Sequence, residues 1–166
     1  MILAELNYKV VFSIYSEKST LIQKCPFTAT VQEDSLAGKG EYMRNKILLI
    51  EDNADLRETI AELLMINGYE VSVAANGLEG LYMATTTLPA VILSDVRMPG
   101  LDGYELTAKL QSSESTCSIP VILTSANFDR QSKPADGHPS VIAHLAKPFD
   151  EENLLTCLVK ALKVSA

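Results

Sequence analysis

The sequence lacks the features that mark an exported, membrane-embedded or nucleic-acid-binding protein. Its three cysteines, Cys25, Cys117 and Cys157, form neither a paired framework nor a Cys-x-x-Cys metal spacing, which favours a reducing compartment. No apolar run approaches the roughly 18 residues of a membrane span, and residues 1–16 lack the plan of a signal peptide. With 14 Lys and Arg against 21 Asp and Glu, the formal charge of -7 leaves no basic surface for phosphate backbones. We therefore expect a cytoplasmic protein with no membrane insertion and no direct nucleic-acid partner.

The composition predicts one globular domain preceded by a short extension. Of the 166 residues, 47% are hydrophobic and 21% are charged, a balance typical of a folded domain. Polar residues and glycines gather at residues 32–45, which places an extension at 1–43 and the domain at 44–166. Two interpretations of the extension stay open. Either Met43 is the physiological start and the preceding residues are a gene-model artefact, or the extension is an arm that packs on the domain or on a partner.

From Lys46 onward, short apolar runs alternate with segments of helical periodicity. This alternation predicts a parallel β-sheet with helices on both faces, the α/β fold class. The expected strands are Ile47–Ile50, Glu70–Ala74, Ala90–Ser94, Val121–Thr124 and Val141–Leu145.

Capping residues and apolar spacing predict four helices. We expect them between Asn53 and Gly68, at Asn76–Thr86, at Asp102–Ser112, and after Asp150 as N-cap. A fifth helix would fall at Asp129–Ser140, but Pro134 and Pro139 interrupt that segment. Since an internal proline costs a helix about 3 kcal/mol, this helix should be short, broken or absent.

Polar residues stand at the carboxyl ends of four predicted strands: Glu51 and Asp52, Asp95, Thr124 and Ser125, and Lys147. Because these ends share one edge of a parallel sheet, we expect the side chains to meet on one rim. Each group alone has an ordinary structural explanation, such as acids at a helix start, an Asx turn, a strand-end hydroxyl or an exposed charge. Their conjunction favours a functional site.

The acidic members of this rim, Glu51, Asp52 and Asp95, would repel one another without a counterion. Hard carboxylate oxygens without histidine or cysteine neighbours suit Mg²⁺ rather than Zn²⁺. A carboxylate beside a divalent ion, the Lys147 ammonium and the Ser125 hydroxyl can accept a phosphoryl group, which gives an acyl phosphate.

Residues Lys46 to Ala161 resemble the receiver domain of two-component response regulators. The resemblance is carried by four motifs in matching order and spacing, Ile47–Asn53, Ser94–Gly103, Pro120–Ala126 and Leu145–Phe149. It implies a flavodoxin-like, doubly wound sheet of five parallel strands in the order 2-1-3-4-5.

The resemblance also implies a role for each residue of the rim. Asp95 would be the phosphoacceptor, and Glu51 and Asp52 would bind Mg²⁺ together with Asp95 and the backbone carbonyl of Arg97. Lys147 would be the lysine that contacts the phosphoryl group.

The resemblance assigns a switch to a hydroxyl at the end of the fourth strand and to a residue in the fifth. We choose Ser125 over Thr124, because Ser125 lies five residues after Pro120 and 22 before Lys147, as the pattern requires. The family often has an aromatic residue three positions before the lysine, and this chain has His144 there. A histidine can follow the same inward path and would add pH sensitivity, whereas a partly exposed strand histidine is the structural alternative.

The implied function is that of a phosphoacceptor signalling domain. A sensor histidine kinase or a histidine phosphotransfer protein would donate the phosphoryl group, and the output would be contact with a further protein or phosphorelay. We expect no enzyme, only a phosphoacceptor signalling domain that catalyses its own phosphorylation and dephosphorylation. Since nothing after Leu162 could hold an output module, a stand-alone receiver is expected.

Two other functions compete with this one. A pseudo-receiver would keep the fold and bind proteins without taking phosphate. A phosphatase of the haloacid dehalogenase type would need a second acid two residues after the nucleophile, where this chain has Arg97.

Overall fold

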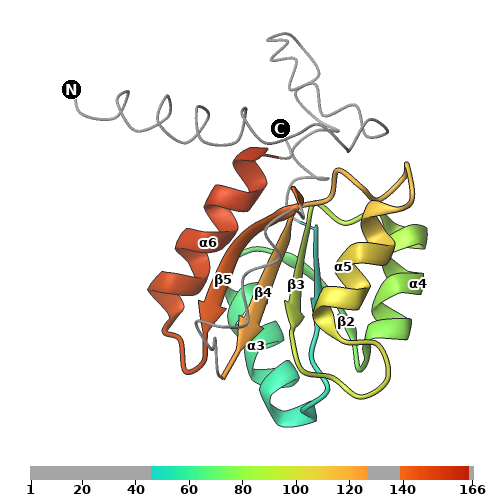
Figure 1. Ribbon diagram of the computed structural model, residues 1–166. Helices are drawn as coiled ribbons and strands as arrows, with labels where there is room; N and C mark the ends of the chain where they lie inside the picture. The colour runs from blue at the N-terminus through green and yellow to red at the C-terminus, as the bar shows by residue number, and fades with distance from the viewer. Residues whose placement is uncertain (1–45, 127–138, 165–166) are drawn as a thin grey trace, which may run out of the picture.

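A computed structural model describes residues 46–126 and 139–164 of the chain. Five strands form one parallel sheet in the order β2-β1-β3-β4-β5 (Figure 1). This is the predicted flavodoxin-like order, and each strand lies within one residue of its predicted ends. The strands are β1 (Lys46–Ile50), β2 (Glu70–Ala74), β3 (Val91–Asp95), β4 (Val121–Ser125) and β5 (Val141–Ala146).

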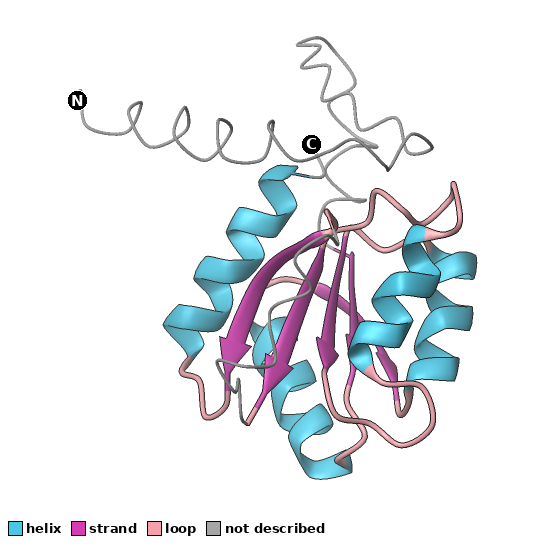
Figure 2. Ribbon diagram, viewed as in Figure 1, coloured by secondary structure: helices cyan, strands magenta, loops and turns pink. Residues whose placement is uncertain are grey.

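Helices cover both faces of the sheet, as the alternating pattern predicted (Figure 2). Helices α3 (Ala54–Ile66) and α6 (Glu151–Val164) pack on one face, and α4 (Gly77–Thr87) and α5 (Gly103–Gln111) pack on the other. Successive side chains of β1 enter opposite cores, because a strand alternates the faces to which its side chains point. Ile47 and Leu49 join the core under α3 and α6, whereas Leu48 and Ile50 join the core under α4 and α5.

Local capping residues set the helix starts. The side chain of Asn53 accepts a hydrogen bond from the backbone N–H of Leu56 at 3.0 Å, and Asp150 accepts one from that of Asn153 at 2.7 Å. At the far end of α3, Gly68 adopts a φ of 86°, which suits glycine. The predicted caps at Asn53, Asp150 and Gly68 are thus confirmed.

Three sequence expectations lie wholly or largely outside the described residues. They are the extension at 1–43, the boundary that follows it, and the proline-interrupted segment at 129–140, of which only residues 139–140 are described. Within the described ranges, no helix combines the length and apolar character that crossing a bilayer requires. Cys157, on α6, is a free cysteine.

The docking of α6 on the sheet can be tested with two neighbouring side chains. Leu158 is completely buried, whereas Val159 is 45% exposed. We expect Leu158→Ala to lower the free energy of unfolding by about 2–5 kcal/mol, because it leaves a cavity in the core. Val159→Ala should change it by no more than about 0.5 kcal/mol. Urea denaturation of both variants measures the difference, and equal losses would contradict the packing described here.

Candidate functional site

The polar residues at the strand ends gather at one edge of the sheet. In the register of the sheet, Ile50 of β1 pairs with Ser94 of β3, and Asp95 of β3 pairs with Thr124 of β4. Strand β5 continues the edge, since Ser125 pairs with Ala146. The residues that end or follow these strands therefore lie side by side, at the point between β1 and β3 where the strand order reverses.

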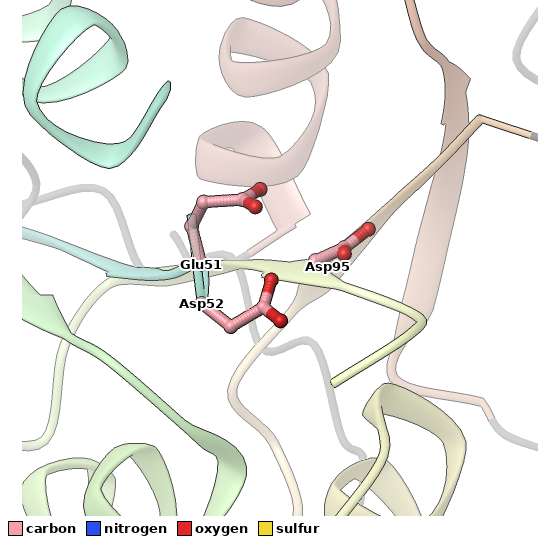
Figure 3. Close-up of side chains that lie close together, drawn as sticks. All are labelled: Glu51, Asp52 and Asp95. Atoms are coloured by element: carbon pink, nitrogen blue, oxygen red, sulfur yellow. The ribbon is translucent and has the colours of Figure 1, made fainter. Parts of the chain in front are cut away.

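Three carboxyl groups meet at this edge. Glu51, Asp52 and Asp95 each offer one oxygen atom, and these atoms all lie within 4.8 Å of one another. Figure 3 shows the carboxyl groups around a common space, two from the end of β1 and one from the end of β3. Glu51 is only 2% exposed and Asp95 8%, whereas Asp52 is open to solvent. The cluster is a group of hard oxygen donors with one open side, a donor set that suits Mg²⁺.

Lys147 brings a positive charge to this cluster from the loop after β5. Its Nζ lies 2.6 Å from Glu51 Oε2 and 3.1 Å from Asp95 Oδ1. The backbone of Lys147 is held next to β4, because its N–H donates to the carbonyl of Ser125 at 2.8 Å. One ammonium group thus bridges the two buried carboxylates.

The charge balance of the cluster remains incomplete. Burial raises the pKa of Glu51 above its ordinary value, and the nearby charge of Asp95 adds to this rise. The hydrogen bond and the charge of Lys147 act in the opposite direction, as does the backbone N–H of Asn53, but the net direction is upward. A further cation would lower the electrostatic cost of ionising Glu51, and the residues present therefore fit a divalent metal.

Both candidate hydroxyl groups lie at the end of β4. Thr124 and Ser125 are each 2% exposed. The Thr124 hydroxyl donates a long hydrogen bond of 3.5 Å to the carbonyl of Ser94. The carbonyl of Ser125 accepts the N–H of Lys147, so Ser125 lies directly beside the lysine.

The other two predicted site residues lie on the flanks of the cluster. Arg97 is exposed in the loop that follows β3. His144 is half-buried on β5, where it pairs with Leu123, and burial lowers the pKa of its imidazole.

The loop after β3 is packed tightly against Asp95. Val96 and Met98 are buried in the core under α4 and α5. Gly103, the first residue of α5, donates its N–H to the carbonyl of Val96 at 2.9 Å. A Cβ at this position would lie 2.5 Å from the carbonyl oxygen of Asp95, so only glycine lets α5 approach this closely.

Arg57 is a site residue that the sequence analysis missed. Its Nη1 donates to the backbone carbonyl of Glu51 at 2.7 Å and to that of Asp52 at 3.4 Å. The signal was present in the sequence, since an arginine one turn into the helix after the acidic pair can reach back to it.

The close approach of α5 to Asp95 gives one prediction. We expect Gly103→Ala to lower the free energy of unfolding by about 1–3 kcal/mol, because the added methyl group meets backbone atoms that cannot rotate away. Lys109→Ala, on the exposed surface of the same helix, should change it by no more than about 0.5 kcal/mol. Chemical denaturation compares the two, and a fully stable Gly103→Ala variant would contradict the packing.

The lowered pKa of His144 gives a second prediction. The folded state favours the neutral imidazole, so the unfolded chain binds a proton more readily as the pH falls below the ordinary value of 6.5. As the pH falls from neutral toward the lowered pKa of His144, the free energy of unfolding of the wild type should therefore decrease more than that of the variant His144→Phe. The variant has no titrating group at position 144. Urea midpoints across this range test the sign, and parallel pH profiles would show that His144 contributes nothing.

Comparison with known proteins agrees with this geometry. The family model described as the response regulator receiver domain matches residues 47–159. Protein PilH of Pseudomonas aeruginosa is 33% identical over 110 residues, which are 66% of this chain and 91% of that protein. A probable transcriptional regulator, ycf29 of Porphyra purpurea, is 35% identical over 120 residues, 72% of this chain and 57% of that relative. The chain thus spans a little over half the length of this last relative.

Solved structures of the same fold include chains that align with this protein over nearly their whole length. Chemotaxis response regulator CheY4 of Vibrio cholerae aligns with a TM-score of 0.65 and 29% identity over 70% of this chain and 97% of that one. The receiver domain of sensor histidine kinase PA1611 from Pseudomonas aeruginosa aligns with a TM-score of 0.66 and 30% identity, covering 72% and 98%. That structure holds a magnesium ion coordinated in its active site cleft.

The family match corrects one expectation from the sequence. Receiver domains of response regulators are phosphoacceptors with autophosphatase activity, so the expectation that the chain is not an enzyme is wrong, and the self-catalysed dephosphorylation expected with it is itself an enzymatic activity. The physical reason is that groups which stabilise charge as a phosphoryl group enters also stabilise it as water removes that group. With the family model matched over 47–159 and the predicted sheet order in place, the chain belongs to the response regulator receiver domain family.

Proposed function

We propose that Asp95 accepts a phosphoryl group from the phosphohistidine of a sensor histidine kinase or a histidine phosphotransfer protein. The observation that carries this proposal is the convergence of Glu51, Asp52 and Asp95, with the Lys147 ammonium 3.1 Å from Asp95. Asp95 is the acid at the end of β3, the central strand of the sheet, where the cluster opens to solvent through the exposed Asp52.

The transfer is an in-line displacement at phosphorus. An oxygen of the Asp95 carboxylate forms the new P–O bond, and the P–N bond of the phosphohistidine breaks with its electron pair moving to the imidazole nitrogen. Lys147 stabilises the negative charge on the transferred oxygens from its position beside Asp95. The hydroxyl of Ser125, at the end of the neighbouring strand, donates to the same group.

The carboxylates of Glu51, Asp52 and Asp95, with the backbone carbonyl of Arg97, would hold Mg²⁺. When bound, the ion neutralises the acidic cluster and the charge of the incoming phosphoryl group. The support from this chain is the donor set itself and the upward shift in the pKa of the buried Glu51.

Phosphorylation would shift the strand ends from one arrangement to another, and a partner protein would distinguish the two. The phosphoryl group on Asp95 carries about two negative charges on its own oxygens, which attract the Ser125 hydroxyl and Lys147. Movement of Ser125 would free space toward His144 on the adjacent strand, and a partner protein would bind the altered face or take the phosphoryl group onward.

Two further proposals concern the setting of the domain. Residues 44–166 form the receiver unit and 1–43 an extension, in keeping with the family match that begins at residue 47. The second proposal is that the protein acts in the cytoplasm, where a nucleotide-dependent kinase would supply the phosphohistidine.

A small phosphodonor tests the assignment of Asp95. Incubation with Mg²⁺ and acetyl phosphate should add one phosphoryl mass to the wild type in intact-protein mass spectrometry. The addition should be absent from Asp95→Asn and retained by Asp55→Asn, which removes an exposed acid outside the cluster. An unmodified wild type would favour the pseudo-receiver, and sustained turnover of a generic phosphoester would favour the phosphatase class.

A further inference from the structure

Arg57 connects helix α3 to the loop that carries two of the acidic residues. Its guanidinium lies on the second turn of the helix and donates from Nη1 to the carbonyl of Glu51 at 2.7 Å. The carbonyl of Asp52 lies 3.4 Å from the same nitrogen, at the outer limit of a hydrogen bond. Bonds from a charged donor are stronger than bonds between neutral groups. The side chain therefore holds the backbone of both acidic residues from a single point.

The loop between β1 and α3 depends on a few such contacts. It has no regular structure from Glu51 to Asn53. The Asn53 side chain caps α3, and the Asn53 carbonyl accepts the backbone N–H of Arg57 at 2.9 Å. These bonds fix the start of the helix, whereas the guanidinium is the group that reaches back to the carbonyls of the acidic pair.

We propose that Arg57 is a positioning residue for the divalent cation. By holding the carbonyls of Glu51 and Asp52, it keeps both carboxylates directed toward Asp95. This inference rests on the proposed function in one respect, namely that the three carboxylates bind Mg²⁺. In this role Arg57 would contact neither the cation nor the phosphoryl group, because its guanidinium donates to the backbone carbonyls.

The positive charge of Arg57 and its hydrogen bonds act on Mg²⁺ binding in opposite directions. The charge repels a cation, so removing it should strengthen binding if charge were its only effect. Loss of the hydrogen bonds frees the loop and should weaken binding. The sign of the change therefore separates a positioning role from a purely electrostatic one, and added salt screens only the electrostatic part.

The test compares Mg²⁺ affinity among variants of the full chain by calorimetry. We expect Arg57→Gln to bind Mg²⁺ about tenfold more weakly than wild type, as found when groups that orient metal ligands are removed. The weakening should persist at high ionic strength. Arg57→Lys keeps the charge and one donor and should recover part of the affinity. Lys109→Gln removes an exposed charge at the last turn of α5 and should leave the affinity unchanged.

A second measurement needs no metal. Amide hydrogen exchange at Asn53 and Ala54 in Mg²⁺-free protein should be faster in Arg57→Gln than in wild type, while exchange within β1 stays unchanged. Unchanged or stronger Mg²⁺ binding by Arg57→Gln would overturn the inference, as would unchanged exchange in the loop. If wild type itself binds no Mg²⁺, the proposed metal site fails, and the exchange data still decide whether Arg57 holds the loop. Should Arg57→Gln fail to fold, the same comparisons apply to Arg57→Lys.

Discussion

The repulsion among three carboxylates at one edge of the sheet is the constraint on which this site depends. Two of them are nearly inaccessible to solvent, so water does little to offset their charge. Lys147 offsets part of it by pairing with both Glu51 and Asp95. Burial, with a smaller contribution from the charge of Asp95, still raises the pKa of Glu51, so a divalent cation at this edge would lower the cost of ionising that carboxyl group.

The order of the strands in the sheet determines where this cluster of carboxyl groups lies. Strands β1 and β3 are neighbours although β2 separates them in sequence, and the chain leaves them toward opposite faces of the sheet. The loops therefore diverge and leave the strand ends open between them. Glu51 and Asp52 approach from one strand and Asp95 from the other, while the buried Val96 and Met98 hold the second loop against the core.

Contacts with the helices also restrict the backbone next to the site. Gly103 brings the start of α5 against the carbonyl of Asp95, and Arg57 ties the start of α3 to the carbonyls of the acidic pair. Helices on both faces thus hold the backbone of the acidic residues. Preorganised donors of this kind lower the cost of rearrangement when charge arrives.

The sequence by itself determined the strands, the helix starts and the identity of the polar residues at the strand ends. Strand alternation and caps such as Asn53 and Asp150 act over a few residues, and such local signals can be read along the chain. The convergence of Asp95 with Glu51 and Asp52 followed from a rule of parallel sheets. Only the tertiary structure decided that Lys147 lies closer to Glu51 than to Asp95, and that Arg57 reaches back across its helix start. Those contacts depend on the rotamers of long side chains and on the relative placement of segments up to 96 residues apart, which no local pattern contains.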